Sequence, residues 1–252
     1  TLFPYTTLFR SGSVWKYPQL WLGMIAIFVY VGVEVSTASN LPEHMKQHLG
    51  LTTDQIAPFI SLFWASLMIG RWTGSVSVFN LSDAGKKFMQ ILMPFIAFGF
   101  YLAVNMIAGH DITPFRYYPF VIIALIIANM LSKDDPGRQL LIFSLIGIAA
   151  LITGMMTDGL VSVYAFISVG LFCSTLWPCI FTLAIKGLGR HTNEGSGLLI
   201  MMIMGGGIIS LLQGFLSKPE LLGIQFSYIV GVVCFAYLAF YAVRTFSIFK
   251  KA

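Results

Sequence analysis

Glu34 is a carboxylate inside a strongly apolar segment, V-Y-V-G-V-E-V-S (29–36), with valines and a glycine close around it. Tyr30, Glu34 and Thr37 share one face of a helix, because residues three and four positions apart lie on the same side. A carboxylate in this setting can bind the hydroxyl groups of a ligand and can titrate during a reaction cycle. A fixed hydrogen bond to a neighbouring helix is the simpler interpretation of the same residue.

A guanidinium group lies in a second apolar run, within I-G-R-W-T-G-S (69–75). An isolated Arg in hydrocarbon costs at least ~2.5–3.5 kcal/mol, so Arg71 needs a carboxylate, carbonyl groups or water. We expect it to act in gating or charge pairing; the alternative is an Arg that only extends to lipid headgroups. Helix rise separates it from Glu34 by ~9 Å in depth, which disfavours a direct ion pair; we expect a water-filled cavity to reach Glu34 instead. Gly70 and Gly74 form a G-x-x-x-G pair that lets two helices approach closely.

A glycine-rich segment with one amide is a further candidate, M-G-G-G-I-I-S-L-L-Q-G (204–214). Its consecutive glycines, Gly205, Gly206 and Gly207, favour close helix packing or local bending. Gln213 shares a helix face with Gly206 by i, i+7 spacing, and its amide suits a hydroxylated ligand. An interhelical hydrogen bond explains Gln213 equally well.

Two tryptophans offer flat faces on which a sugar ring can pack, Trp64 in the second apolar run and Trp177 in L-F-C-S-T-L-W-P-C-I-F (171–181). Pro178 removes a backbone hydrogen bond and is expected to kink its helix. Together with Asn40 and the carboxylate and amide groups above, these residues predict a site for a polar ligand. Aromatic residues that face lipid or the protein core are the alternative.

The motifs of enzymes and metal sites are absent from this sequence. G-L-G-R-H-T-N-E-G lacks the G-K-[ST] of a phosphate-binding loop, and no H-E-x-x-H or paired cysteines indicate a metal. The three cysteines, Cys173, Cys179 and Cys234, lie in apolar segments and are interpreted as small buried hydrophobic residues. We therefore expect no enzyme activity, no metal and no cofactor.

The elements that position these residues must be membrane-spanning helices. The chain has 252 residues, of which 57% are hydrophobic and 10% charged, and its mean hydropathy is +0.84. A soluble domain carries ~25% charged residues, so this chain has too few to cover a surface facing water. Because a spanning helix needs ~20 apolar residues, the sequence predicts an all-α integral membrane protein with helices at about 20–40, 56–79, 88–108, 117–131, 139–157, 160–185, 195–216 and 224–246.

The distribution of basic residues predicts the orientation of these helices. One set of alternate loops holds only Lys46, Arg116 and Lys218, whereas the other holds most of the Lys and Arg. Cytoplasmic loops collect Lys and Arg, so both termini are expected in the cytoplasm. Residues 1–13 lack a starting Met and the order of a signal peptide, and we interpret them as a non-native or unassigned leader. The short run 117–131 contains Pro119, which leaves a re-entrant segment as an alternative to a full span.

Four segments carry a family resemblance: V-Y-V-G-V-E-V-S, M-I-G-R-W-T-G-S, L-W-P-C-I-F-T-L-A-I-K-G-L-G and T-N-E-G-S-G-L-L-I-M-M-I-M-G-G-G-I-I-S-L-L-Q-G. From about residue 15 to 246 the chain resembles the C-terminal half of the fucose/glucose-galactose permease branch of the major facilitator superfamily. That half has six helices, so the runs within 88–131 are expected to be an inserted pair. The resemblance implies a missing N-terminal six-helix half as the partner.

The same resemblance implies transport of a sugar such as fucose, glucose or galactose across the bacterial inner membrane. Transport would be coupled to H⁺ and would proceed by alternating access, with two halves moving about a site near the bilayer midplane. One alternative is a transporter of another solute, a drug or an organic acid, on the same fold. A second alternative is a sugar sensor that binds without transport. We expect no nucleic acid partner.

Overall fold

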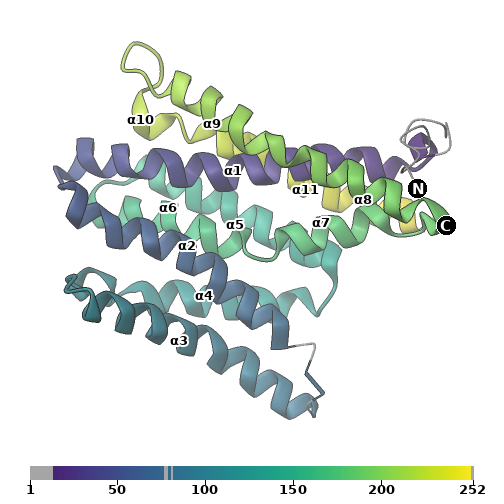
Figure 1. Cartoon of the computed structure of the whole chain (residues 1–252), viewed down its shortest axis with the longest axis horizontal. Coiled ribbons are helices and arrows are strands. Elements are labelled where there is room, and N and C mark those ends of the chain that lie inside the picture. The colour runs from purple at the N-terminus through teal and green to yellow at the C-terminus, as the bar shows by residue number, and fades with distance from the viewer. Residues whose placement is uncertain (1–13, 77–78, 81, 251–252) are drawn as a thin grey trace, which may run out of the picture.

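The computed structural model describes residues 14–76, 79–80 and 82–250, so the predicted leader at 1–13 lies outside the described residues. The described chain folds into a bundle of long helices that run back and forth along one axis (Figure 1). Eight segments are long and apolar enough to cross a membrane. The predicted all-α fold with about eight hydrophobic helices is therefore confirmed.

The first two helices begin before the apolar runs that the sequence shows, and α1 also ends later while α2 ends earlier. Helix α1 spans Pro18–Leu49 and continues past Pro42, and α2 spans Thr53–Ser75. Helix α1 ends where Gly50 adopts a left-handed conformation (φ 65°), and the Gly50 N–H donates to the Lys46 carbonyl group at 3.2 Å. A capping box starts α2, in which the Thr52 N–H donates to the Gln55 side chain at 3.0 Å.

Each of the next three helices is continuous. Helix α3 spans Asp83–Ile107, α4 spans Tyr118–Ser132 and α5 spans Pro136–Met156. Capping side chains start two of them, since Ser82 accepts from the Gly85 N–H and Asp135 from the Arg138 N–H. The segment Thr113–Ser132, which includes a short 3₁₀ turn before α4, is long enough to span a membrane despite Pro119.

Each of the last three spans is interrupted. The predicted helix 160–185 consists of α6 (Gly159–Cys173) and α7 (Leu176–Ile185). The run predicted at 195–216 is α8 (Thr192–Met201), a 3₁₀ turn and α9 (Gly205–Leu216). The last consists of α10 (Gly223–Phe226) and α11 (Ile229–Lys250). Pro178 explains the first break, because it has no N–H to continue the helical ladder.

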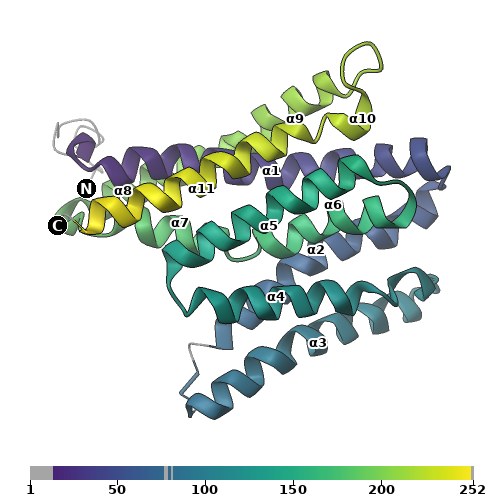
Figure 2. The ribbon, with the colours of Figure 1, turned by 180° about the vertical axis from the view of Figure 1, so that it is seen from behind.

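Helix α1 lies at the centre of the bundle and packs against α6, α7, α9 and α11, while α5 packs against α6 and α11. Helices α3 and α4 lie side by side at the flank beyond α2 and α5, as both views show (Figures 1 and 2). We call the end of the bundle where α1 begins and α11 ends the basic end. It carries Lys86, Lys133, Arg138 and Lys186 at the helix termini.

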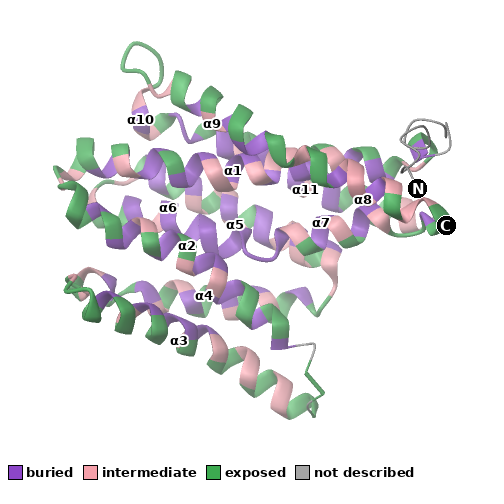
Figure 3. Ribbon diagram, in the orientation of Figure 1, coloured by how far each residue is buried: buried purple, intermediate pink, exposed green. Residues whose placement is uncertain are grey.

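Burial follows this arrangement (Figure 3). The core is made of apolar side chains of the central helices, among them Ile27, Leu62, Phe143 and Phe166, all fully buried. Helix α3 and the α8–α9 segment instead expose rows of large apolar side chains, including Phe100 and Leu211. An apolar surface of this kind suits contact with lipid or with further transmembrane helices.

Candidate functional site

Glu34 lies near the middle of α1 and is partly buried. The hydroxyl group of Tyr30, one helical turn earlier, donates a hydrogen bond to the Glu34 carboxylate. Trp177 of α7 packs edge-on against the Tyr30 ring, with ring centroids 6.2 Å apart. Two helices therefore fix the position of this carboxylate, α1 directly and α7 through the aromatic pair.

A cavity of about 260 Å³ opens beside Glu34. Its other lining residues come from α2: Trp64, Leu67, Met68, Arg71 and Trp72. Trp64 is 46% exposed, so its indole face is available on the open side of this cavity. The structure thus brings three of the predicted site residues, Glu34, Trp64 and Arg71, to one place.

Arg71 is held by a backbone carbonyl group rather than by a carboxylate. Its Nε donates to the Ser174 carbonyl oxygen at 3.4 Å. In a regular helix that carbonyl would accept from residue 178, which is a proline and has no N–H. Within the part of the chain that the structure describes, no carboxylate lies within 4.0 Å of Arg71. The break between α6 and α7 therefore supplies the acceptor that an Arg in an apolar helix needs.

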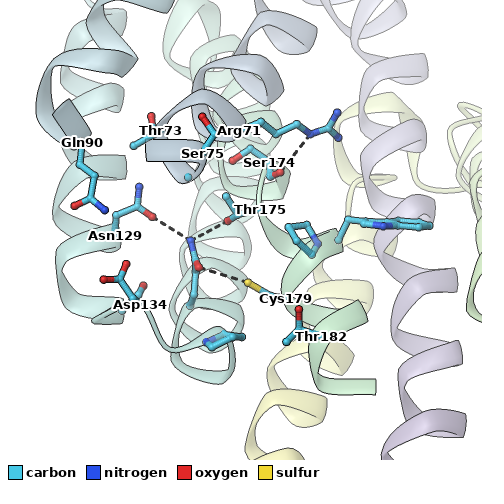
Figure 4. A pocket seen from close by; sticks show the side chains of 16 residues that line it. Arg71, Thr73, Ser75, Gln90, Asn129, Asp134, Ser174, Thr175, Cys179 and Thr182 are labelled. Atoms are coloured by element: carbon cyan, nitrogen blue, oxygen red, sulfur yellow. Dashed lines mark hydrogen bonds between the residues drawn. The ribbon is translucent and has the colours of Figure 1, made fainter. Parts of the chain in front are cut away.

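Arg71 also lines a second cavity, of about 690 Å³, near the basic end (Figure 4). Trp177 and Pro178 contribute to its wall, whereas Trp64 lines the Glu34 cavity, so the two predicted tryptophans line different cavities. The remaining lining is rich in amide and hydroxyl side chains from α2, α3, α4, α5 and α7. We call it the polar cavity.

Two predicted binding residues lie outside both cavities. Asn40 is buried and its Nδ2 donates to the Ser36 carbonyl oxygen at 2.9 Å. Gln213 is fully buried, and its Nε2 lies 3.4 Å from the Ser227 hydroxyl group. Its Oε1 has no hydrogen-bond partner in the described part of the chain. A role for either residue in substrate binding remains a prediction.

The predicted packing glycines differ in how much space surrounds them. A Cβ atom at Gly70 would collide with the Ser174 side chain, and one at Gly205 would collide with the backbone of Phe28 in α1. Gly206 faces Val31 and Val35, with the nearest atom 3.1 Å from the position of a Cβ. A Cβ atom at Gly74 would make an ordinary contact, 3.5 Å from the Thr175 side chain, and one at Gly207 would meet open space. Gly70 and Gly205 are thus the sites of closest helix approach.

Several polar residues of the polar cavity were not predicted from the sequence. Gln139 donates through Nε2 to Asn129 and to Thr175, each at 3.1 Å, and its Oε1 accepts from the Cys179 thiol at 3.5 Å. The signal that points to them is a polar side chain within an apolar run, as for Asn129 in I-I-A-N-M. As for metals, the described residues contain no group of three or more His, Cys, Asp and Glu that could bind an ion.

Curated relatives match almost the whole chain, although no family model matches it. It is 31% identical over 234 residues to a glucose/galactose transporter of Brucella abortus and 28% identical over 236 residues to a putative glucose/galactose transporter of Helicobacter pylori. Each match covers 92% of this chain, but only 43% of the Brucella protein and 45% of the Helicobacter protein. The L-fucose-proton symporter of Escherichia coli is 32% identical over 113 residues, 45% of this chain and 26% of the symporter.

A solved structure decides the fold. The major facilitator superfamily transporter FucP, in its outward conformation, superposes with a TM-score of 0.65 at 23% identity. This match covers 90% of this chain and 42% of FucP. The chain has a major facilitator fold. The predicted resemblance to the fucose/glucose-galactose permeases is confirmed, and the named relatives are transporters rather than enzymes.

The matches also define how much of this fold is present. The chain spans about 43% of the glucose/galactose transporter it matches and 42% of FucP. This share is consistent with one half of a major facilitator transporter, the C-terminal half that the motifs indicate. Its eight candidate spans are two more than the six helices of such a half. The flank position of α3 and α4 makes this pair the candidate insertion.

Proposed function

We propose that this chain is part of a secondary transporter that carries a hexose across the bacterial cytoplasmic membrane together with H⁺. The observation that carries the proposal is the match over 92% of the chain to a glucose/galactose transporter. The cavity beside Glu34 supports it, because a carboxylate, an exposed indole and a guanidinium converge there. Hydroxyl groups of a sugar can donate to the carboxylate and accept from the guanidinium, while the ring packs on Trp64.

Glu34 is the group we assign to proton coupling. It is the ionisable acid of this cavity, and it lies beside an Arg that forms no ion pair within the described residues. The hydrogen bond from Tyr30 favours the carboxylate form, whereas an apolar surrounding favours the neutral acid. Opening and closing of the cavity changes that surrounding, so the carboxyl group can take up a proton on one side and release it on the other. That the related E. coli protein is named a proton symporter supports H⁺ as the coupling ion.

The open side of the Glu34 cavity suggests the partner of this bundle. Trp64 and Trp72, which line this cavity, are exposed at 46% and 39%, and apolar side chains of α8 and α9, two helices that pack against α1, are exposed as well. We assign this face to a second, N-terminal six-helix bundle of the same transporter. Alternating access then consists of a movement of the two bundles about the cavity, with both ends of this chain in the cytoplasm.

Uptake of radiolabelled sugars tests the proposal. The complete transporter that contains this chain would be reconstituted in proteoliposomes and supplied with galactose, glucose or fucose under an inward H⁺ gradient. We expect saturable uptake of at least one sugar that stops when an uncoupler removes the gradient. Uptake of an organic acid or export of a drug without sugar uptake would favour the other solute classes. Saturable sugar binding without uptake would favour a sensor.

A further inference from the structure

The polar cavity is separate from the Glu34 cavity, although Arg71 lines both. Its wall is built jointly by the α3–α4 pair and the rest of the bundle (Figure 4). Gln90 comes from α3, Asn129 and Ser132 from α4, and Asp134 from the turn that follows. Without that pair the cavity would lack one whole side, so it is specific to chains that carry these two helices.

The chemistry of the lining favours a neutral ligand with many hydroxyl groups. One guanidinium, Arg71, and one carboxylate, Asp134, leave the wall without net charge. Most of the other polar groups are amides and hydroxyls, which both donate and accept hydrogen bonds: Gln90, Asn129, Gln139, Thr73, Ser75, Ser132, Ser174, Thr175 and Thr182. Trp177 adds an apolar surface beside them. A volume of about 690 Å³ accommodates a small solute.

Part of this wall is already fixed in position. Gln139 bridges α4 and α7, because its Nε2 donates to both Asn129 and Thr175 and its Oε1 accepts from Cys179. The bond from Gln139 occupies the Asn129 oxygen and leaves the Asn129 amide nitrogen for a ligand. The Gln90 side chain has no hydrogen-bond partner among the described residues. Donors held in place without a ligand reduce the entropy that binding must overcome.

We propose that the polar cavity is a second carbohydrate-binding site, distinct from the Glu34 cavity and lined by the α3–α4 pair. The observations favour a sugar over a lipid phosphate, because the carboxylate of Asp134 would repel an anion and the lining carries only one cation. This inference rests on the proposed transport function only for the choice of sugars as probes.

Equilibrium binding to the complete transporter in lipid nanodiscs tests the inference, in a Glu34→Gln background that weakens the proposed transport site. Tritiated glucose and galactose are the probes, and the variants are Gln90→Leu and Asn129→Leu, singly and combined. Gln47→Leu is the matched control, because Gln47 is exposed at the opposite end of α1. We expect saturable binding that the double variant weakens at least tenfold, while Gln47→Leu changes it less than twofold. Saturable binding that the double variant leaves unchanged would overturn the proposal, and so would the absence of saturable binding of both sugars.

A second measurement decides the matter if the double variant does not fold. Ser75 is exposed and lines the polar cavity, whereas the three native cysteines are buried. A Ser75→Cys chain is expected to react with a maleimide, and glucose is expected to slow that reaction at least threefold. Slowing by phosphatidylglycerol alone would assign the cavity to a lipid headgroup and overturn the sugar site. Loss of transport in the complete protein with this protection intact would contradict only the transport function.

Discussion

The Nε atom of Arg71 in α2 donates to the carbonyl group of Ser174 at the break between α6 and α7, at 3.4 Å. Pro178 cannot donate to that carbonyl, so a kink in one helix provides the acceptor for a charge on another. The same Arg lines both the Glu34 cavity and the polar cavity. The Arg71 side chain thus contacts the helix break and also lines the two cavities, one at Glu34 and one near the basic end of the bundle.

Replacement of Arg71 by Lys tests whether this geometry matters beyond its charge. A lysine keeps the cation but has no Nε–H at the position that reaches the Ser174 carbonyl group. We expect Arg71→Lys to lower sugar uptake by the complete transporter at least tenfold at normal protein levels. Arg138→Lys is the control, because Arg138 is exposed at the basic end, and it should leave uptake within twofold. Equal uptake by both variants would show that Arg71 acts only as a charge.

Glu34→Gln keeps the shape of the side chain and removes its charge. We expect sugar uptake to fall at least tenfold and the remaining uptake to lose its dependence on pH. Glu43→Gln on the same helix is the control, since Glu43 is exposed and contacts Gln47. The measurement is initial uptake rate against pH.

Tyr30→Phe separates the two roles proposed for this pair. It removes the hydrogen bond to Glu34 but keeps the ring that packs against Trp177. We expect the pH profile of uptake to shift, with affinity for the sugar changed less than in Glu34→Gln. If Glu34→Gln has unchanged affinity and an unchanged pH profile, Glu34 is a structural residue only.

Neighbouring glycines in α9 provide a matched test of helix packing. A Cβ at Gly205 would collide with the backbone of Phe28, whereas a Cβ at Gly207 would meet open space. We expect Gly205→Ala to lower the free energy of unfolding by about 1–3 kcal/mol, since overpacking forces backbone shifts. Gly207→Ala should change it by less than about 1 kcal/mol. Denaturant unfolding in detergent measures both, and equal effects would contradict the close approach of α1 and α9.

Cysteine labelling tests the orientation and the spanning of α3 and α4. Asp111 lies in the connection between these helices, and Lys87 lies at the basic end of α3. In whole cells we expect a membrane-impermeant maleimide to label Asp111→Cys from outside and to leave Lys87→Cys unlabelled until the cells are opened. Labelling of Asp111→Cys only after lysis would show that its connection does not reach the outer surface.

The eight helices could be predicted from the sequence because length and apolar content decide whether a segment spans a membrane. The positions at which three of these helices are interrupted were not predicted. Pro178 indicated a kink, but not that the carbonyl group of Ser174 at this break accepts from Arg71, which lies far away in the sequence. The extension of α1 to Leu49 was likewise hidden, because its last turns are polar and carry no apolar signal.

For the candidate site, the sequence indicated which side chains are unusual but not which of them meet. Glu34, Trp64 and Arg71 converge because α1 and α2 pack together in this register. Gln213 has the same kind of polar side chain, yet it is fully buried beside Ser227. The Gln139 network joins α4, α5 and α7 and depends on how the flank pair docks, which no local pattern encodes.

Coupling of sugar movement to H⁺ can be measured directly with a pH electrode. Cells that produce the complete transporter would be de-energised in a weakly buffered medium, and galactose, glucose or fucose would be added. We expect a transported sugar to make the medium more alkaline, and Glu34→Gln to abolish this change at equal protein level. Sugar entry without any alkalinisation in the unmodified transporter would contradict the coupling of sugar transport to H⁺.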